Sequence, residues 1–93
     1  MKAIWKNVTL AESKNVVEVQ GVHFFPPDSL RKEFFEESET HATIRGKGEV
    51  RYKHVVVEGE LNTDAAWYYP QPAPGKGVVK NYVAFGKDVK VLG

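Results

Sequence analysis

Short apolar runs alternate with polar residues along most of the chain, and Gly, Asn, Asp and Pro separate them. This period of two, without sustained helical periodicity, predicts a mostly β protein. Residues 2–6 and 8–11 form a candidate first hairpin, because Asn7 tolerates the positive φ of a tight turn. Residues 16–25 predict a second strand, which Pro26 ends because proline has no backbone N–H to donate.

The strongest predicted strand covers residues 50–57. Its apolar positions change side near His54, which indicates either a bulge there or passage from an exposed edge into a two-sided core. A two-residue hairpin turn is expected at Glu58-Gly59, with the glycine supplying a positive φ. Residues 79–85 and 89–92 predict the last hairpin.

Other segments carry weaker signals. Residues 27–35 and 63–69 predict short helical turns, the second held by capping at Asp64. Residues 33–39 hold four glutamates and no basic residue, which favours a solvated loop. The expected fold is therefore all-β, a compact single domain over residues 1–93 with coiled antiparallel sheets and one or two short helical turns. The expected core is the apolar side of the strands: Trp5, Leu10, Val17, Val19, Val56, Val83, Phe85 and Val89.

Composition narrows the class of protein. The 93 residues are 42% hydrophobic and 27% charged, the balance of one soluble globular domain. With 13 Lys+Arg against 12 Asp+Glu, the net charge of +1 is too small to gather nucleic acid or a membrane surface, so we expect neither as a partner. The chain has no apolar run long enough to span a bilayer and no start typical of a signal peptide, so we expect a cytoplasmic protein.

Metal and nucleophile chemistry find little support in the sequence. There is no cysteine, and the three histidines (His23, His41 and His54) lack the spacing of a closed metal site. No serine lies in a nucleophile-elbow sequence. We therefore expect no metal and no cofactor.

Two segments do suggest a ligand site. Trp67-Tyr68-Tyr69 places three rings side by side, so at least one escapes the main core and is either the lid of a small core or a stacking wall for a flat ligand. Residues 41–48 combine a base, two cations and flexible backbone, which suits either an anion or a plain loop with solvated cations. The hairpin at residues 58–59 would bring these segments together. The predicted ligand-binding residues are His41, Lys47, Tyr52, Trp67 and Tyr69.

Several runs occur in a familiar order: Lys2-Ala3-Ile4-Trp5, Leu10-Ala11-Glu12-Ser13, Phe25-Pro26-Pro27, Asp64-Ala65-Ala66-Trp67-Tyr68-Tyr69-Pro70 and Tyr82-Val83-Ala84-Phe85. With these, nearly the whole chain resembles the family called domain of unknown function 427, small bacterial and fungal proteins sometimes labelled as nucleotidyltransferases. The resemblance implies a β-tent-like all-β domain without zinc, and no established activity. Paired aspartates on a strand and a serine-rich glycine loop, usual in nucleotidyl transfer, are missing from this sequence.

One departure from the family pattern bears on mechanism. Many members read Cys-Pro-Trp-Lys-Gly where this chain has Ile44-Arg45-Gly46-Lys47-Gly48. A mechanism that required that cysteine would not transfer to this chain. A mechanism based on Lys47, Tyr52 and the aromatic segment would.

Three functions follow as hypotheses, with the oligomeric state left open. The first is binding of a small, flat, anionic ligand. The second is an enzyme at the same pocket, with His41 as general acid or base, Lys47 holding an anionic oxygen, and Tyr52 or Tyr69 donating a hydrogen bond. The third is a protein-interaction module that uses an exposed strand edge and the proline-rich loop. A closed cavity would favour the first two, and a flat apolar patch the third.

Overall fold

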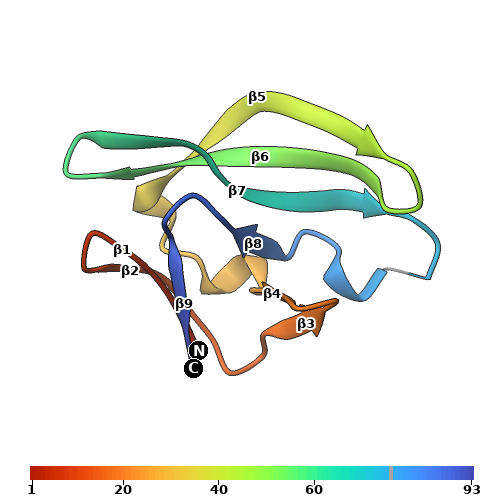
Figure 1. Ribbon diagram of the computed structural model, residues 1–93, viewed down its shortest axis with the longest axis horizontal. Helices are drawn as coiled ribbons and strands as arrows, with labels where there is room; N and C mark the ends of the chain where they lie inside the picture. Colours follow the sequence, from red (N-terminus) through yellow and green to blue (C-terminus); the bar gives the residue numbers. More distant parts are fainter. Residues whose placement is uncertain (76) are drawn as a thin grey trace.

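The protein is all-β. A computed structural model describes residues 1–75 and 77–93, and within them nine strands form three antiparallel sheets (Figure 1). The large sheet has the order β5 (Phe35–Ile44), β6 (Gly48–Val57), β7 (Glu60–Pro72), β8 (Val83–Phe85). The second has the order β2 (Val8–Glu12), β1 (Lys2–Trp5), β9 (Lys90–Leu92), and the third is the hairpin of β3 (Val17–Val19) and β4 (Val22–Phe24).

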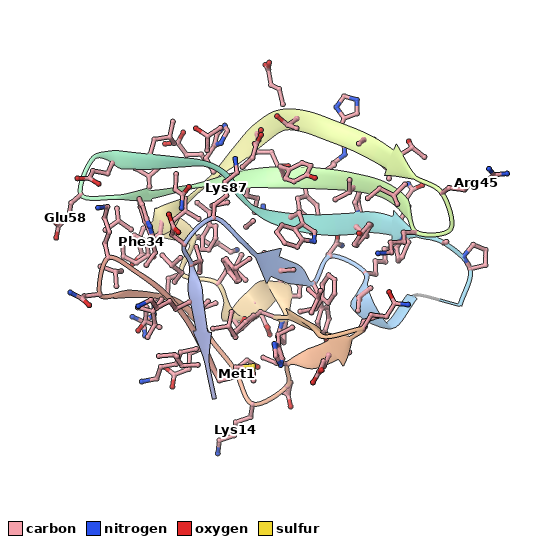
Figure 2. All side chains as sticks on the ribbon, in the orientation of Figure 1. Met1, Lys14, Phe34, Arg45, Glu58 and Lys87 are labelled. Atoms are coloured by element: carbon pink, nitrogen blue, oxygen red, sulfur yellow. The ribbon has the colours of Figure 1, made fainter. Side chains whose placement is uncertain are left out.

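Two predicted hairpins are confirmed, and their turns have the expected geometry. Lys6 and Asn7 join β1 to β2 with φ of 52° and 64°. Glu58 and Gly59 join β6 to β7 with φ of 51° and 78°. Positive φ at both central residues matches the right-handed twist of the paired strands. Arg45 and Glu58 mark opposite ends of the large sheet (Figure 2), and the Glu58 end is joined to the β1–β2 turn by an ion pair of 2.7 Å between Lys6 and Glu60.

The prediction of one strand over residues 16–25 is wrong. Gln20 and Gly21 have φ of 52° and 82° and turn the chain, so that Val17 pairs with Phe24 in a short hairpin. The turn uses the same chemistry as Glu58-Gly59, a polar residue followed by glycine. Alternating residues on both sides of Gly21 conceal the turn when the segment is treated as a single strand.

Of the two segments predicted to form helical turns, residues 27–35 do so and residues 63–69 do not. Two 3-10 turns, η1 (Pro27–Ser29) and η2 (Lys32–Phe34), lie within residues 27–35. Residues 63–69 instead belong to strand β7, where pairing with β6 overrides local capping chemistry. A further turn, η3 (Gly77–Val79), follows the proline-rich segment.

The predicted loop over residues 33–39 is also wrong, since β5 begins at Phe35. Most of its residues are exposed, and it forms the outer edge of the large sheet. Charged side chains are common on such edges because they discourage pairing with other chains. The glutamates therefore mark an exposed strand.

The last predicted hairpin does not form. Strand β8 pairs with β7, with Ala84 opposite Trp67, whereas β9 pairs with β1, with Val91 opposite Ala3. The chain end thus returns to its beginning, and the two termini lie side by side (Figure 1). Among the residues that the structure describes, no helix has the length and apolar character needed to cross a bilayer.

The core is partly the expected one. Leu10 and Val83 are buried as predicted, whereas Trp5, Val17, Val19, Phe85 and Val89 are only partly buried. Val56 is likewise only partly buried, and its neighbours Val55 and Val57 are buried in its place. Val50 is buried in one core cluster, and Val55 and Val57, on the opposite side of β6, are buried in another, so the strand enters a two-sided core. The register of β6 against β7 also shifts between Lys53 and Val55, but the extra residues lie on β7.

Phe25 joins the sheets and has an exposed fraction of 0%. Its backbone N–H and C=O both bond Val83, at 2.8 Å each, and its ring meets Phe85 edge to face with centroids 5.6 Å apart. It also packs with Ala3 and Ala11 from the sheet that holds the termini. Phe25 therefore connects the large sheet to the second sheet.

We predict that Phe25→Ala lowers the free energy of unfolding by ~3–5 kcal/mol, because it empties a fully buried ring position. The measurement is urea denaturation followed by circular dichroism. Leu61→Ala, at a position 56% exposed, is the control and should change stability by less than about 0.5 kcal/mol. Similar losses in the two variants would contradict this picture of the core.

Candidate functional site

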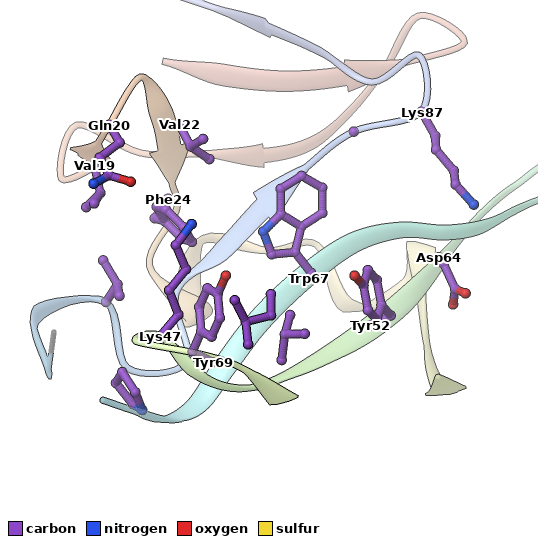
Figure 3. A pocket seen from close by; sticks show the side chains of 15 residues that line it. Val19, Gln20, Val22, Phe24, Lys47, Tyr52, Asp64, Trp67, Tyr69 and Lys87 are labelled. Carbon is purple, nitrogen blue, oxygen red and sulfur yellow. The ribbon is translucent and has the colours of Figure 1, made fainter. Parts of the chain in front are cut away.

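A cavity of about 520 Å³ lies between the large sheet and the β3–β4 hairpin (Figure 3). This volume falls within the range of roughly 300–1,000 Å³ that is usual for small-molecule sites. Apolar side chains form most of the wall: Val19, Val22, Phe24, Val50, Trp67 and Val79. Polar groups come from Gln20, Lys47, Tyr52, Asp64, Tyr69 and Lys87.

The aromatic floor of the cavity comes from two paired strands. Tyr52 on β6 lies directly opposite Trp67 on β7, and Tyr69 follows two residues later on the same face. The Trp67 ring packs against the backbone at Gly86, where an added Cβ would lie 3.0 Å from the ring atom Cζ3. Glycine at this position leaves room for the indole.

The turn between β5 and β6 closes one end of the cavity. The Lys47 N–H donates to the Ile44 carbonyl at 3.0 Å, and the Lys47 carbonyl accepts from the Ala73 N–H at 3.0 Å. Gly48 has a φ of 100°, and a Cβ there would lie 2.7 Å from the Gln71 carbonyl oxygen. The turn is thus held tightly against the end of β7, and the Lys47 side chain extends beside Tyr69 (Figure 3).

Two bulges shape the other end. Residues 38–40 of β5 oppose only Tyr52, and residues 63–65 of β7 oppose only His54. Extra residues in a strand redirect side chains and are frequent beside binding sites. Here they accompany a φ of 54° at Asp64 and a hydrogen bond of 3.0 Å from the Asp64 N–H to His54 Nδ1. Asp64 and Lys87 lie together at this end, with Trp67 and Tyr52 between them and Lys47 (Figure 3).

The Asp64 carboxylate stays ionised at neutral pH. A hydrogen bond from the Ser38 hydroxyl is the largest influence and lowers the pKa of Asp64, whereas burial acts in the opposite direction. Thr40, His54 and Lys87 lower it further. Its oxygen Oδ1 is buried and has no hydrogen-bond partner among the described residues, and it lies 3.6 Å from His54 Nδ1.

Four of the five predicted ligand-binding residues surround this cavity: Lys47, Tyr52, Trp67 and Tyr69. His41 does not. It is exposed on β5 opposite Arg51, and its Nδ1 lies 3.1 Å from the Glu39 carbonyl oxygen. Alternation along β6 places Arg51 on the other face from Val50 and Tyr52, which line the cavity, so its partner His41 faces away from the cavity as well.

Asp64 had been expected to cap a helical turn, which is wrong because it lies on a strand and lines the cavity. Sequence reasoning also missed Phe24 and Lys87. Phe24 belonged to the strand predicted over residues 16–25, and its place follows from the turn at Gln20-Gly21. Lys87 reaches the cavity because β8 and β9 join different sheets, a topology for which the sequence gives no local signal.

The opposite face of the same strands carries a compact polar group. Tyr68 donates a hydrogen bond of 2.5 Å to Glu37 Oε2, and Lys53 Nζ donates one of 3.0 Å to Oε1. Lys53 Nζ also lies 4.8 Å from the centre of the Tyr68 ring. Burial, followed by the hydrogen bond to Glu37, raises the pKa of Tyr68 to about 12. Tyr68 therefore ties β7 to β5 across β6 and is separate from the cavity.

A family comparison agrees with the order of motifs along the chain. The family model described as Domain of unknown function (DUF427), labelled NTP_transf_9, matches residues 1–92. The chain belongs to this family. The comparison with curated proteins found no match. The β-tent architecture that the resemblance implies stays a prediction for this DUF427 protein.

The described part of this DUF427 protein contains no group of three or more His, Cys, Asp or Glu side chains arranged to hold a metal ion. His54 and Asp64 are a pair. The residues that line the cavity offer stacking on aromatic rings, charge from Lys47 and Lys87, and hydrogen bonding to phenol and carboxylate oxygens.

We predict that Gly48→Ala destabilises the DUF427 protein more than Gly46→Ala does. Both positions have positive φ, which costs alanine about 1–2 kcal/mol, but only at Gly48 does the new Cβ also strike the Gln71 carbonyl. That overlap should add ~1–3 kcal/mol to the loss of unfolding free energy in urea. Equal losses would show that the turn is not pressed against β7.

We also predict that one tyrosine of the folded protein ionises near pH 12, about two pH units above the ordinary value of 10.0. Because folding raises the pKa of Tyr68, the neutral phenol and the hydrogen bond to Glu37 persist as the pH rises through 10 and are lost towards 12. Tyrosinate absorbance during a pH titration measures this step. It should vanish in Tyr68→Phe and move to lower pH in Glu37→Gln, and its persistence in Tyr68→Phe would refute the assignment.

Proposed function

We propose that this protein binds a small, flat, anionic ligand in the cavity between the large sheet and the β3–β4 hairpin. The observation that supports this most is that a lysine and three aromatic side chains, from the β5–β6 turn, β6 and β7, line one cavity. An aromatic face stabilises a planar ring by stacking, and an ammonium group at the rim stabilises an anion.

The contacts of Lys47 support an anionic ligand. Its backbone is fixed by two hydrogen bonds, whereas its side chain is exposed and takes part in none of the ion pairs between described residues. A cation on a fixed backbone beside an apolar wall can receive a carboxylate or phosphate without first breaking another contact. The family label NTP_transf_9 makes nucleotides a natural first set of probes.

Binding is favoured over the two other hypotheses. The enzyme hypothesis used His41 as acid or base, and His41 lies outside the lining of the cavity. A flat apolar patch would favour the interaction-module hypothesis, whereas Lys47 and Trp67 line one cavity, which favours a ligand. The exposed edge of β5 remains available in the fold, but its charges and its bulge are features by which edges avoid partners.

The test is a thermal-shift screen with nucleotides, sugar phosphates and aromatic acids, followed by titration of the compounds that bind. A ligand at ~100 times its dissociation constant should add about 2.7 kcal/mol to the free energy of unfolding. Trp5→Phe leaves Trp67 as the remaining tryptophan of the chain, so that its fluorescence reports binding at the cavity.

Lys47→Gln should weaken binding of an anionic ring compound at least about tenfold, which corresponds to 1.4 kcal/mol. Lys14→Gln, at an exposed residue outside the cavity lining, is the matched control and should bind as the parent does. Failure of every anionic aromatic compound to bind, or equal binding by Lys47→Gln, would overturn the proposed function.

A further inference from the structure

The outer edge of the large sheet changes character along β5. This strand is the first in the sheet order and lies at the outside of the molecule (Figure 1). Three glutamates within residues 36–39 and the bulge over residues 38–40 protect the first half of the edge. Residues 40–44, which read Thr-His-Ala-Thr-Ile, include no Asp, Glu, Lys or Arg. The second half of the edge therefore lacks the charges by which edges avoid other strands.

This second half is also accessible. Every residue from His41 to Arg45 is exposed, and pairing with β6 occupies one side of the strand. The Ile44 side chain, 37% exposed, is one of the large apolar side chains that the described part of the chain leaves at the surface. The free side of such a strand presents backbone N–H and C=O groups that a further strand can satisfy.

The sequence of this edge is complementary to itself. Two copies that pair antiparallel about a two-fold axis at Ala42 bring opposite charges together at both ends, because Glu39 of each copy then lies opposite Arg45 of the other. Opposite charges that face each other across an antiparallel pair stabilise it. The pairs between these ends are Ala42 with Ala42, His41 with Thr43, and Thr40 with Ile44.

The same register matches the backbone groups. Along an antiparallel strand, the N–H and C=O groups of alternate residues point to opposite sides. Residues paired about Ala42 are an even number of positions apart in sequence, so the outward groups of one copy meet the outward groups of the other. A centre one residue earlier brings the bulge to the symmetry axis, and a centre one residue later places Arg45 opposite His41. Ala42 is therefore the favoured centre.

Glu39 and Arg45 are available for this contact. Both are exposed, and neither takes part in an ion pair with another residue that the structure describes. The Arg45 side chain extends into solvent at one end of the large sheet (Figure 2). Glu39 lies within the bulge, and the long side chain of arginine can follow the displacement that a bulge causes.

We propose that this protein forms a two-fold symmetric dimer in which residues 40–44 of two copies pair antiparallel and join two large sheets into one. The occupant of the edge is a second copy of the chain, and Glu39 and Arg45 fix the register. The dimer does not depend on ligand binding in the cavity. Because a contact of this length buries little surface, the association is weak and needs a high protein concentration.

Sedimentation equilibrium of the full chain tests the dimer. The wild-type protein should dimerise at about 1 mM and dissociate on dilution. Glu39→Arg and Arg45→Glu each place like charges together at both ends, so each should raise the dissociation constant at least about tenfold. Glu36→Arg makes the same charge change earlier on β5, at an exposed residue outside the contact, and as the matched control should dimerise as the wild type does.

The two charge variants also test the register directly. In an equimolar mixture, one variant brings two cations to the contact and the other brings two anions, so opposite charges again meet at both ends. The mixture should therefore form dimers at a concentration where each variant alone is monomeric. This rescue requires Glu39 to face Arg45 across the symmetry axis, and a merely structural effect of either substitution would not produce it.

A third measurement uses only the wild-type protein and locates the contact. In nitrogen-proton correlation spectra, the amide signals of residues 41–43 should shift as the protein concentration rises, while those of β9 should not. The shifts should be absent from Glu39→Arg over the same range.

Several outcomes would overturn the proposal. These are a wild-type protein that stays monomeric up to about 1 mM, dimers that persist equally in both charge variants, a mixture that stays monomeric, and concentration-dependent shifts confined to another surface. None of them bears on the proposed function, because the thermal-shift screen measures ligand binding at the cavity separately.

Discussion

The antiparallel pairing of β6 with β7 is the constraint on which the rest of the structure depends. These two strands join at the tight turn of Glu58 and Gly59 and remain paired from Val57 and Glu60 to Gly48 and Pro72. Both outer strands of the large sheet attach to this pair, β5 to β6 and β8 to β7. Through β8 the pair also positions Phe25 and the β4 strand that covers the cavity.

The irregular positions of the β6–β7 pair shape the cavity as much as its regular positions do. Three residues of β7 oppose His54, and three residues of β5 oppose Tyr52, so that extra backbone accumulates around one end of the cavity. At regular positions, alternation separates Trp67 and Tyr69 from Tyr68, so that the two faces acquire different chemistry. One face is the aromatic floor of a cavity. The other is a hydrogen-bonded group in which Glu37 receives both Tyr68 and Lys53.

Two glycines fit this arrangement for steric reasons. Gly48 allows the turn that carries Lys47 to approach the backbone of β7, and Gly86 allows the Trp67 ring to lie against the chain that leaves β8. In both places a side chain would occupy space that another group already fills. The cation and the indole of the candidate site therefore rest on positions that do not themselves contribute side chains to it.

The sequence by itself determined the all-β class and the turns at Asn7 and Gly59, and it indicated a change near His54 and four residues that line the cavity. These features depend on period-two alternation and on residues that adopt positive φ, which are local properties. Tertiary structure decided that residues 63–69 form strand, that β8 and β9 join different sheets, and that Asp64 and Lys87 face the cavity while His41 does not. Those outcomes depend on partner strands far away in sequence and on their register, which local residue patterns do not specify.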